Sequence, residues 1–137
     1  MVSYQQEGYI QQVRRTDTAK NLILLVEDDE VTASLLCQVI QQETPYQIAH
    51  TSDGITAWKF LQYVRPQLVI LDYRLPGMDG IQLYDNMRLN SISHDIPVLL
   101  LSAVPPTREI VQRKIVSLQK PFDLDELLHT IDMLLTF

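Results

Sequence analysis

The sequence predicts an α/β protein, a doubly wound (βα)5 sandwich around a parallel sheet of five strands. From Asn21 onward, short apolar runs alternate with stretches whose apolar residues have helical spacing. The apolar runs are nearly continuous, as is typical of strands that are buried on both faces. Strands that alternate with helices imply right-handed crossovers, and therefore parallel neighbours.

Five apolar runs mark the predicted strands, and Gly and Pro residues separate the segments. Runs of this length, bounded by turn residues, fit strands better than helices. The predicted strands are Leu22–Val26, Tyr46–Ala49, Leu68–Leu71, Val98–Leu101 and Ile115–Leu118.

Four other stretches carry apolar residues on one helical face. These residues are Leu35, Leu36, Val39 and Ile40 in the first; Ala57, Trp58, Leu61 and Val64 in the second; Leu83, Tyr84 and Met87 in the third; and Leu127, Leu128, Ile131, Leu134 and Leu135 in the last. Because Cys37 and Trp58 lie on apolar helix faces, we expect both in the core. Between the last two strands Pro105-Pro106 delays any helix, so only about two turns remain, from Thr107 to Lys114.

Composition limits the possible functions. The 137 residues are 46% apolar and carry a formal net charge of −6, which fits one acidic domain and argues against nucleic acid or an anionic membrane as partner. No apolar run approaches the ~20 residues that span a bilayer, and residues 1–20 lack the apolar core of a signal peptide. The single cysteine excludes an intrachain disulfide, so we expect a cytoplasmic protein.

Acidic side chains follow two of the predicted strands. Glu27, Asp28 and Asp29 come after the first strand, and Asp72 comes after the third. In open parallel sheets ligands bind at the carboxyl ends of the strands. Crowded carboxylates repel one another unless a cation joins them, and Mg²⁺ takes one or two carboxylates together with phosphate oxygens. We therefore predict a Mg²⁺ site made by Asp28 and Asp72, with Glu27 helping through water.

The same edge has the groups that phosphoryl transfer needs. An aspartate oxygen can attack phosphorus to form an acyl phosphate, and the transferring group requires nearby donors and positive charge. Ser102 ends the fourth strand and offers a hydroxyl, and Lys120 follows the fifth and offers an ammonium group. The pattern predicts Asp72 as a nucleophile that is assisted by Ser102 and Lys120.

Each residue alone has a plainer interpretation. The Glu27–Asp29 cluster could complement a helix dipole, Asp72 could cap a turn, Ser102 could be a loop residue and Lys120 could be solvated. Their joint placement at strand ends favours the reactive site. The remaining titratable candidates are ungrouped histidines, which we expect to be surface or internally hydrogen-bonded residues: His50, His94 and His129.

Four motifs, in this order, resemble the receiver domain of bacterial two-component response regulators. They are Ile23-Leu24-Leu25-Val26-Glu27-Asp28-Asp29-Glu30, Leu71-Asp72-Tyr73-Arg74-Leu75-Pro76-Gly77-Met78-Asp79-Gly80, Leu101-Ser102-Ala103 and Lys120-Pro121-Phe122. The resemblance implies a flavodoxin-like fold with strand order 2-1-3-4-5 and a receiver domain over residues 21–137. Residues 1–20 form a polar extension that we expect to be disordered or helical.

The resemblance also implies a role for each matching residue. Asp72 is the phosphoacceptor, which takes a phosphoryl group from a sensor histidine kinase or a histidine phosphotransfer protein. Asp28 is a direct Mg²⁺ ligand, Glu27 a water-mediated one, and the backbone carbonyl of Arg74 a further ligand. Ser102 turns toward the phosphoryl group.

Lys120 is the residue that pairs with the phosphoryl group in this family. By the same analogy, the Lys120–Pro121 peptide bond is cis.

The chain departs from the family near its fifth strand. Ser117 stands where family members usually have an aromatic residue, whose ring moves when the hydroxyl residue turns. The segment between Ser102 and Lys120 is shorter than usual, which predicts a shortened fourth helix. We therefore expect output through a remodelled face, formed by the fourth helix, the fifth strand and the fifth helix, with residues 1–20 as a candidate part of it.

The chain ends at Phe137 without a recognisable output domain, which predicts a stand-alone response regulator that signals by protein–protein interaction. Its activity is expected to go no further than self-phosphorylation and autodephosphorylation. The downstream target is unknown, and a homodimer is one possible state. The alternative is a phosphorylation-independent interaction module. A small-molecule phosphatase is disfavoured, because Arg74 occupies the place of the second acid in an Asp-x-Asp pair.

Overall fold

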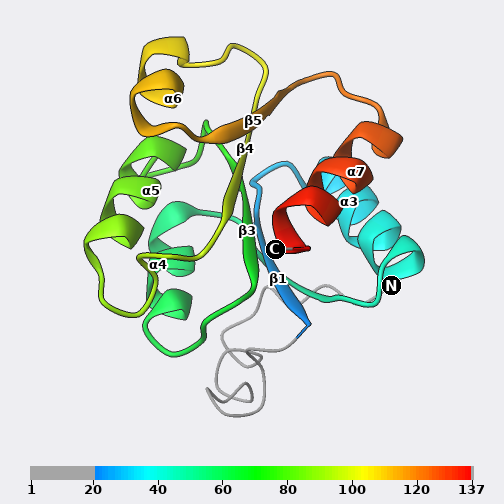
Figure 1. Cartoon of the computed structure of the whole chain (residues 1–137), viewed down its shortest axis with the longest axis horizontal. Coiled ribbons are helices and arrows are strands. Elements are labelled where there is room, and N and C mark those ends of the chain that lie inside the picture. Colours follow the sequence, from blue (N-terminus) through cyan, green and yellow to red (C-terminus); the bar gives the residue numbers. More distant parts are fainter. Residues whose placement is uncertain (1–20, 137) are drawn as a thin grey trace.

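The computed structural model describes residues 21–136, which build a parallel sheet between two layers of helices (Figure 1). The strands lie in the order β2-β1-β3-β4-β5. Their bounds are β1 (Leu22–Val26), β2 (Gln47–Thr51), β3 (Leu68–Asp72), β4 (Val98–Ser102) and β5 (Val116–Gln119). This confirms the doubly wound (βα)5 sandwich of order 2-1-3-4-5. The predicted extension, residues 1–20, lies outside the described residues.

A helix follows each strand. The helices are α3 (Glu30–Glu43), α4 (Gly54–Leu61), α5 (Gly80–Leu89), α6 (Thr107–Arg113) and α7 (Leu124–Leu135). In Figure 1, α4, α5 and α6 lie on one side of the sheet, and α3 and α7 on the other. Within residues 21–136, no helix has both the length and the apolar character needed to cross a membrane.

The strand side chains alternate between two apolar layers. Ile23 and Leu25 join the cluster beneath α3 and α7, whereas Leu22, Leu24 and Val26 join the cluster beneath α4 and α5. All five are at most 1% exposed. Two buried faces explain why the apolar runs are continuous, because neither face of these strands meets water. Each fully buried side chain of this size contributes about 1.5–3 kcal/mol to stability.

Three helices begin at an aspartate that caps the backbone. Each carboxylate accepts a hydrogen bond from the N–H three residues later, which satisfies a donor that the helix leaves unpaired. These caps are Asp29, Asp53 and Asp79. Of the acidic residues after β1, Asp29 therefore stabilises α3, whereas the side chains of Glu27 and Asp28 do not cap this helix.

The structure corrects three details of the sequence prediction. Strand β2 runs on to Thr51 and includes His50, because polar residues at a strand end interrupt no backbone pairing. Strand β5 starts at Val116, since the N–H of Ile115 donates to the Ile110 carbonyl of α6. Leu35 is 49% exposed, because the buried stripe of α3 passes on its other side. That stripe is Ala33, Leu36, Cys37 and Ile40.

Cys37 is buried, as expected. Trp58 is partly buried and packs against the core cluster beneath α4 and α5.

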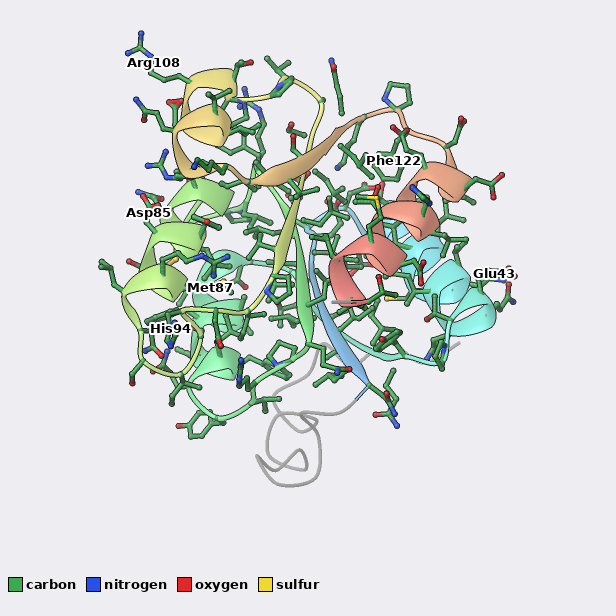
Figure 2. All side chains as sticks on the ribbon, viewed as in Figure 1. Glu43, Asp85, Met87, His94, Arg108 and Phe122 are labelled. Atoms are coloured by element: carbon green, nitrogen blue, oxygen red, sulfur yellow. The ribbon has the colours of Figure 1, made fainter. Side chains whose placement is uncertain are left out.

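Helix α6 is short and lightly attached. It has seven residues, and in this described segment none is buried. Pro106 provides no side-chain cap, and Lys114 ends the helix with a left-handed φ of 58°, a conformation that non-glycine residues rarely adopt. The Arg113 guanidinium binds Asp85 of α5 at 2.7 and 2.9 Å. Figure 2 shows Asp85 on α5, facing the α6 end of the molecule.

Candidate functional site

Sheet register brings the predicted residues to one edge. Leu101 is opposite Asp72 on the neighbouring strand, and Ser102 is opposite Gln119. The pairing continues past the strand ends, because the N–H of Tyr73 bonds to the Leu101 carbonyl and the N–H of Lys120 to the Ser102 carbonyl, each at 2.8 Å. Consecutive strands therefore present Asp72, Ser102 and Lys120 at the same level.

The acidic cluster forms as predicted. Glu27, Asp28 and Asp72 each offer a carboxylate oxygen, and these atoms lie within 4.8 Å of one another. Glu27 is 1% and Asp72 7% exposed, whereas Asp28 is exposed. Two buried acids beside an exposed one make a notch with one open side. Oxygen ligands in this number suit a hard cation such as Mg²⁺, which keeps several waters and takes few carboxylates.

Lys120 bridges the two buried acids. Its Nζ lies 3.0 Å from Glu27 Oε1 and 2.9 Å from Asp72 Oδ1. The Lys120–Pro121 bond is cis, as predicted. The ammonium group supplies part of the positive charge that buried carboxylates need, and it stands where a phosphoryl group on Asp72 would meet it.

Burial controls the protonation of this group of residues. Desolvation raises the pKa of Glu27, and the neighbouring charge of Asp72 raises it further. Burial likewise raises the pKa of Asp72, against the lowering effect of its hydrogen bond to Lys120. Burial lowers the pKa of Lys120, but the hydrogen bonds to Asp72 and Glu27 outweigh it and the pKa ends above its usual value. One lysine does not neutralise the notch, which therefore favours a further cation.

Glu27 is fixed at every polar atom. Oε1 accepts from Lys120, and Oε2 accepts from the N–H of Asp29 at 3.1 Å. Its own N–H donates to the Thr51 carbonyl at 3.0 Å, and its carbonyl lies 2.7 Å from Nε2 of His50. A carboxylate held in this way is preorganised, and it fits contact with a metal through water better than direct ligation.

Ser102 is a predicted site residue whose functional atom, the hydroxyl oxygen, is buried without a protein partner among the described residues. It is 2% exposed, and its buried Oγ has no hydrogen-bond partner among the described residues. Buried hydroxyls are normally paired, so an unpaired one is notable. It lines a hollow of about 70 Å³ together with Asp72 and Lys120. The hollow thus has a donor, a cation and the candidate nucleophile in its wall.

Arg74 is exposed and lies between two hollows. It lines the 70 Å³ hollow and also a shallower one of about 330 Å³, which includes Asp28 and Asp79. The role of its backbone carbonyl as a metal ligand stays a prediction.

Sequence reasoning missed three residues beside the site. Tyr73 lines both hollows, and Ala103 lines the smaller one. His50 is internally hydrogen-bonded, which is one of the two expected states, but its position was not predicted: it is 2% exposed and contacts the Glu27 backbone beside the acidic cluster. Only the position of His50 near a strand end, level with the acidic cluster, could have indicated this contact. His94 and His129 are exposed, as expected of surface histidines.

Comparison with known proteins places this geometry in a family. The model of the response regulator receiver domain matches residues 23–132. Sporulation initiation phosphotransferase F of Bacillus subtilis is 31% identical over 108 residues, which cover 76% of this chain and 86% of that protein. The chain spans less than half the length of several DNA-binding or transcriptional regulators that it also matches.

A solved structure of a receiver domain has the same fold as this chain. The receiver domain of a Pseudomonas aeruginosa sensor histidine kinase, with a magnesium ion coordinated in its active-site cleft, is 26% identical with a TM-score of 0.78. The match covers 85% of this chain and 98% of that one.

Proposed function

Because the chain belongs to the response regulator receiver domain family, we propose that it accepts a phosphoryl group on Asp72 in a Mg²⁺-dependent phosphorelay. The donor is a sensor histidine kinase or a histidine phosphotransfer protein. The phosphorylated chain then signals by binding another protein.

One observation carries this proposal above the others. Around the buried Asp72, three different strand ends contribute an acidic pair, an ammonium group and a hydroxyl that has no partner among the described residues. A purely structural ion pair has no use for the unpaired Ser102 hydroxyl. A site that binds a phosphoryl group, by contrast, needs such a hydroxyl as a hydrogen-bond donor to a phosphoryl oxygen.

The chemistry follows from these positions. A carboxylate oxygen of Asp72 attacks phosphorus, the phosphorus–nitrogen bond of the donor histidine breaks, and its electron pair returns to the imidazole. Lys120 meets the negative charge of the transferred group, and Ser102 donates a hydrogen bond to one of its oxygens. Asp28 and Asp72, together with Glu27 through water and the Arg74 carbonyl, would hold Mg²⁺, whose charge would offset that of the phosphoryl oxygens.

Incubation with a small-molecule phosphodonor and Mg²⁺ tests the proposal. We expect intact mass to increase by one phosphoryl group, and the adduct to be lost at alkaline pH as an acyl phosphate is. Asp72→Asn should remain unmodified, and Asp132→Asn, an exposed aspartate on α7, should react as the wild type does. Equal modification of Asp72→Asn, or an alkali-stable adduct, would contradict the assignment.

The finer expectations belong to the same proposal. We place the receiver domain at residues 21–137, with residues 1–20 as an extension, in the cytoplasm. A stand-alone regulator that signals by protein–protein interaction is part of this proposal. The only catalysis we assign is self-phosphorylation and autodephosphorylation. A homodimer is one form in which the chain could act.

A second candidate is a receiver-like module that binds its partner regardless of phosphorylation. Ser117 motivates this candidate, because it stands where the family usually has the aromatic residue that moves when the hydroxyl residue turns. Partner affinity separates the two. Measured with Asp72 phosphorylated and with Asp72→Asn, different affinities support the phosphorelay regulator, and equal affinities support the constitutive module.

A further inference from the structure

We propose that His50 is a positioning residue for the acidic cluster, and that its ring fixes the peptide from which Asp28 projects. The inference rests on the proposed metal site, since it concerns how that site is held ready. In the proposed reaction His50 neither binds the metal nor contacts the phosphoryl group.

The contact between the His50 ring and the Glu27 carbonyl can be a hydrogen bond in one direction only. His50 is 2% exposed on β2, opposite Leu25 of β1, and its Nε2 lies 2.7 Å from the Glu27 carbonyl oxygen. A carbonyl oxygen can only accept a hydrogen bond. The Nε2 atom therefore carries a proton and donates it to that carbonyl.

The contacted carbonyl belongs to the peptide unit that joins Glu27 to Asp28. A peptide unit is planar, so holding its oxygen fixes the orientation of the whole plane. That plane sets the direction in which the chain enters Asp28. The imidazole thus acts on Asp28 through the backbone, without touching its carboxylate.

A second contact to the Glu27 backbone comes from Thr51, the next residue of β2, and we call this pair of contacts from His50 and Thr51 the clamp. The N–H of Glu27 donates to the Thr51 carbonyl at 3.0 Å. Both backbone groups of Glu27 are thereby bound by adjacent residues of one strand, although Glu27 lies beyond the end of β1. Of the two contacts, the Thr51 one is ordinary sheet pairing and needs no special side chain. The His50 contact depends on the side chain, so it can be removed by substitution.

Residues that orient metal ligands typically change metal affinity by 10–100-fold when they are replaced. We therefore expect His50→Leu, which fills the space without a donor, to weaken Mn²⁺ binding about tenfold. His50→Gln, whose amide can donate to the same carbonyl, should keep most of the affinity. Free Mn²⁺ can be followed by electron paramagnetic resonance, with Mn²⁺ alone as the probe.

Ser93→Ala is the matched control. Ser93 is fully buried, and its Oγ donates to the Met87 carbonyl at 3.0 Å, in the loop that leads into the opposite end of β4. Both substitutions remove a buried side-chain bond to a backbone carbonyl. Loss of Mn²⁺ affinity in His50→Leu alone supports positioning. Wild-type affinity in His50→Leu, or an equal loss in Ser93→Ala, overturns it.

Metal-free measurements separate this inference from the proposed function. A wild type that binds no Mn²⁺ contradicts the metal site, while the backbone amide signals of Asp28 and Asp29 still report on His50. These signals should shift in His50→Leu and not in Ser93→Ala, and the absence of a shift overturns the inference. Should His50→Leu fail to fold, the nitrogen-15 spectrum of the wild-type imidazole decides. A protonated Nε2 supports the clamp, and an unprotonated one overturns it.

Discussion

The acidic edge, which consists of Glu27, Asp28, Asp72 and Lys120, meets the α6–β5 segment at Lys120, directly after β5, yet the two regions are held by different means. At the acidic edge, Glu27 is buried and bonded at every polar atom. In the described residues of α6 none is buried: Ile110 packs partly buried against the core cluster, and a bidentate ion pair joins Arg113 to Asp85 of α5. Segments with few buried contacts open with the smallest free energy. The contrast teaches that the strands hold the residues of the acidic edge in place, while the neighbouring α6 can change its position at a lower cost in free energy.

Removing the bridging cation should give the largest effect. Lys120→Met leaves Glu27 and Asp72 buried without their shared partner, and charged hydrogen bonds of this kind contribute about 1.5–3 kcal/mol. We expect the free energy of unfolding to fall by about 2 kcal/mol at pH 7 in urea titrations. Lys59→Met, at an exposed position on α4, should change it little. Similar losses in both variants would erase the special status of the acidic edge.

Removing one buried charge should have the opposite sign. Without metal, Asp72→Asn should raise the free energy of unfolding by about 1 kcal/mol at pH 7, because a neutral group no longer suffers desolvation. Thermal or urea unfolding of the metal-free proteins measures this, with the exposed Asp132→Asn as control.

The pH dependence of this gain follows from the direction of the shift. Folding raises the pKa of Asp72 above the ordinary value of 3.8, so the folded state holds its proton more tightly. The wild type consequently loses stability as pH rises from that value through the folded-state pKa. The advantage of Asp72→Asn should be absent below pH 3.8 and complete above the folded-state pKa. An advantage that grows on acidification would contradict the account.

The α6 attachment can be tested by breaking its ion pair. Asp85→Asn removes the partner of Arg113, and partly exposed pairs of this kind contribute up to about 1 kcal/mol. We expect faster amide hydrogen exchange in Thr107–Arg113 and unchanged exchange in α3. Asp95→Asn, which breaks the surface pair with Arg65, is the matched control and should leave α6 exchange as it is. Uniform acceleration across the domain would show that α6 is no separate unit.

Ser102→Ala should have the smallest effect on the unmodified protein. Because Ser102 Oγ has no partner among residues 21–136, its removal breaks no bond there, and we expect stability within about 0.5 kcal/mol of wild type. The same variant should reach a lower level of phosphorylation, measured by intact mass. A large loss of stability would mean that the hydroxyl has a structural role instead.

Much of this fold could be predicted from sequence, for a physical reason. Strands buried on both faces must be continuously apolar, so the apolar runs predict the bounds of β1, β3 and β4 to within one residue. Strand β2 was placed too early, because His50 and Thr51 are polar and their pairing with β1 depends on the backbone alone.

The site shows the same limit. Carboxyl ends of parallel strands meet at one edge, so the convergence of Asp28, Asp72, Ser102 and Lys120 followed from topology. The contact of His50 with a backbone carbonyl could not follow, because no residue pattern encodes which strand-end side chain turns toward a neighbouring backbone. Leu35 was misplaced for a related reason: an apolar side chain next to a buried stripe looks the same in sequence whichever way the helix is turned.

Magnesium binding tests the central claim most directly. The metal-free protein, titrated with Mg²⁺ in a calorimeter at pH 7, should bind one ion per chain at millimolar concentration or below, and Asp28→Asn should lose most of that affinity while remaining folded. Absence of binding at millimolar Mg²⁺ in the folded wild type, or equal affinity in Asp28→Asn, would contradict the account.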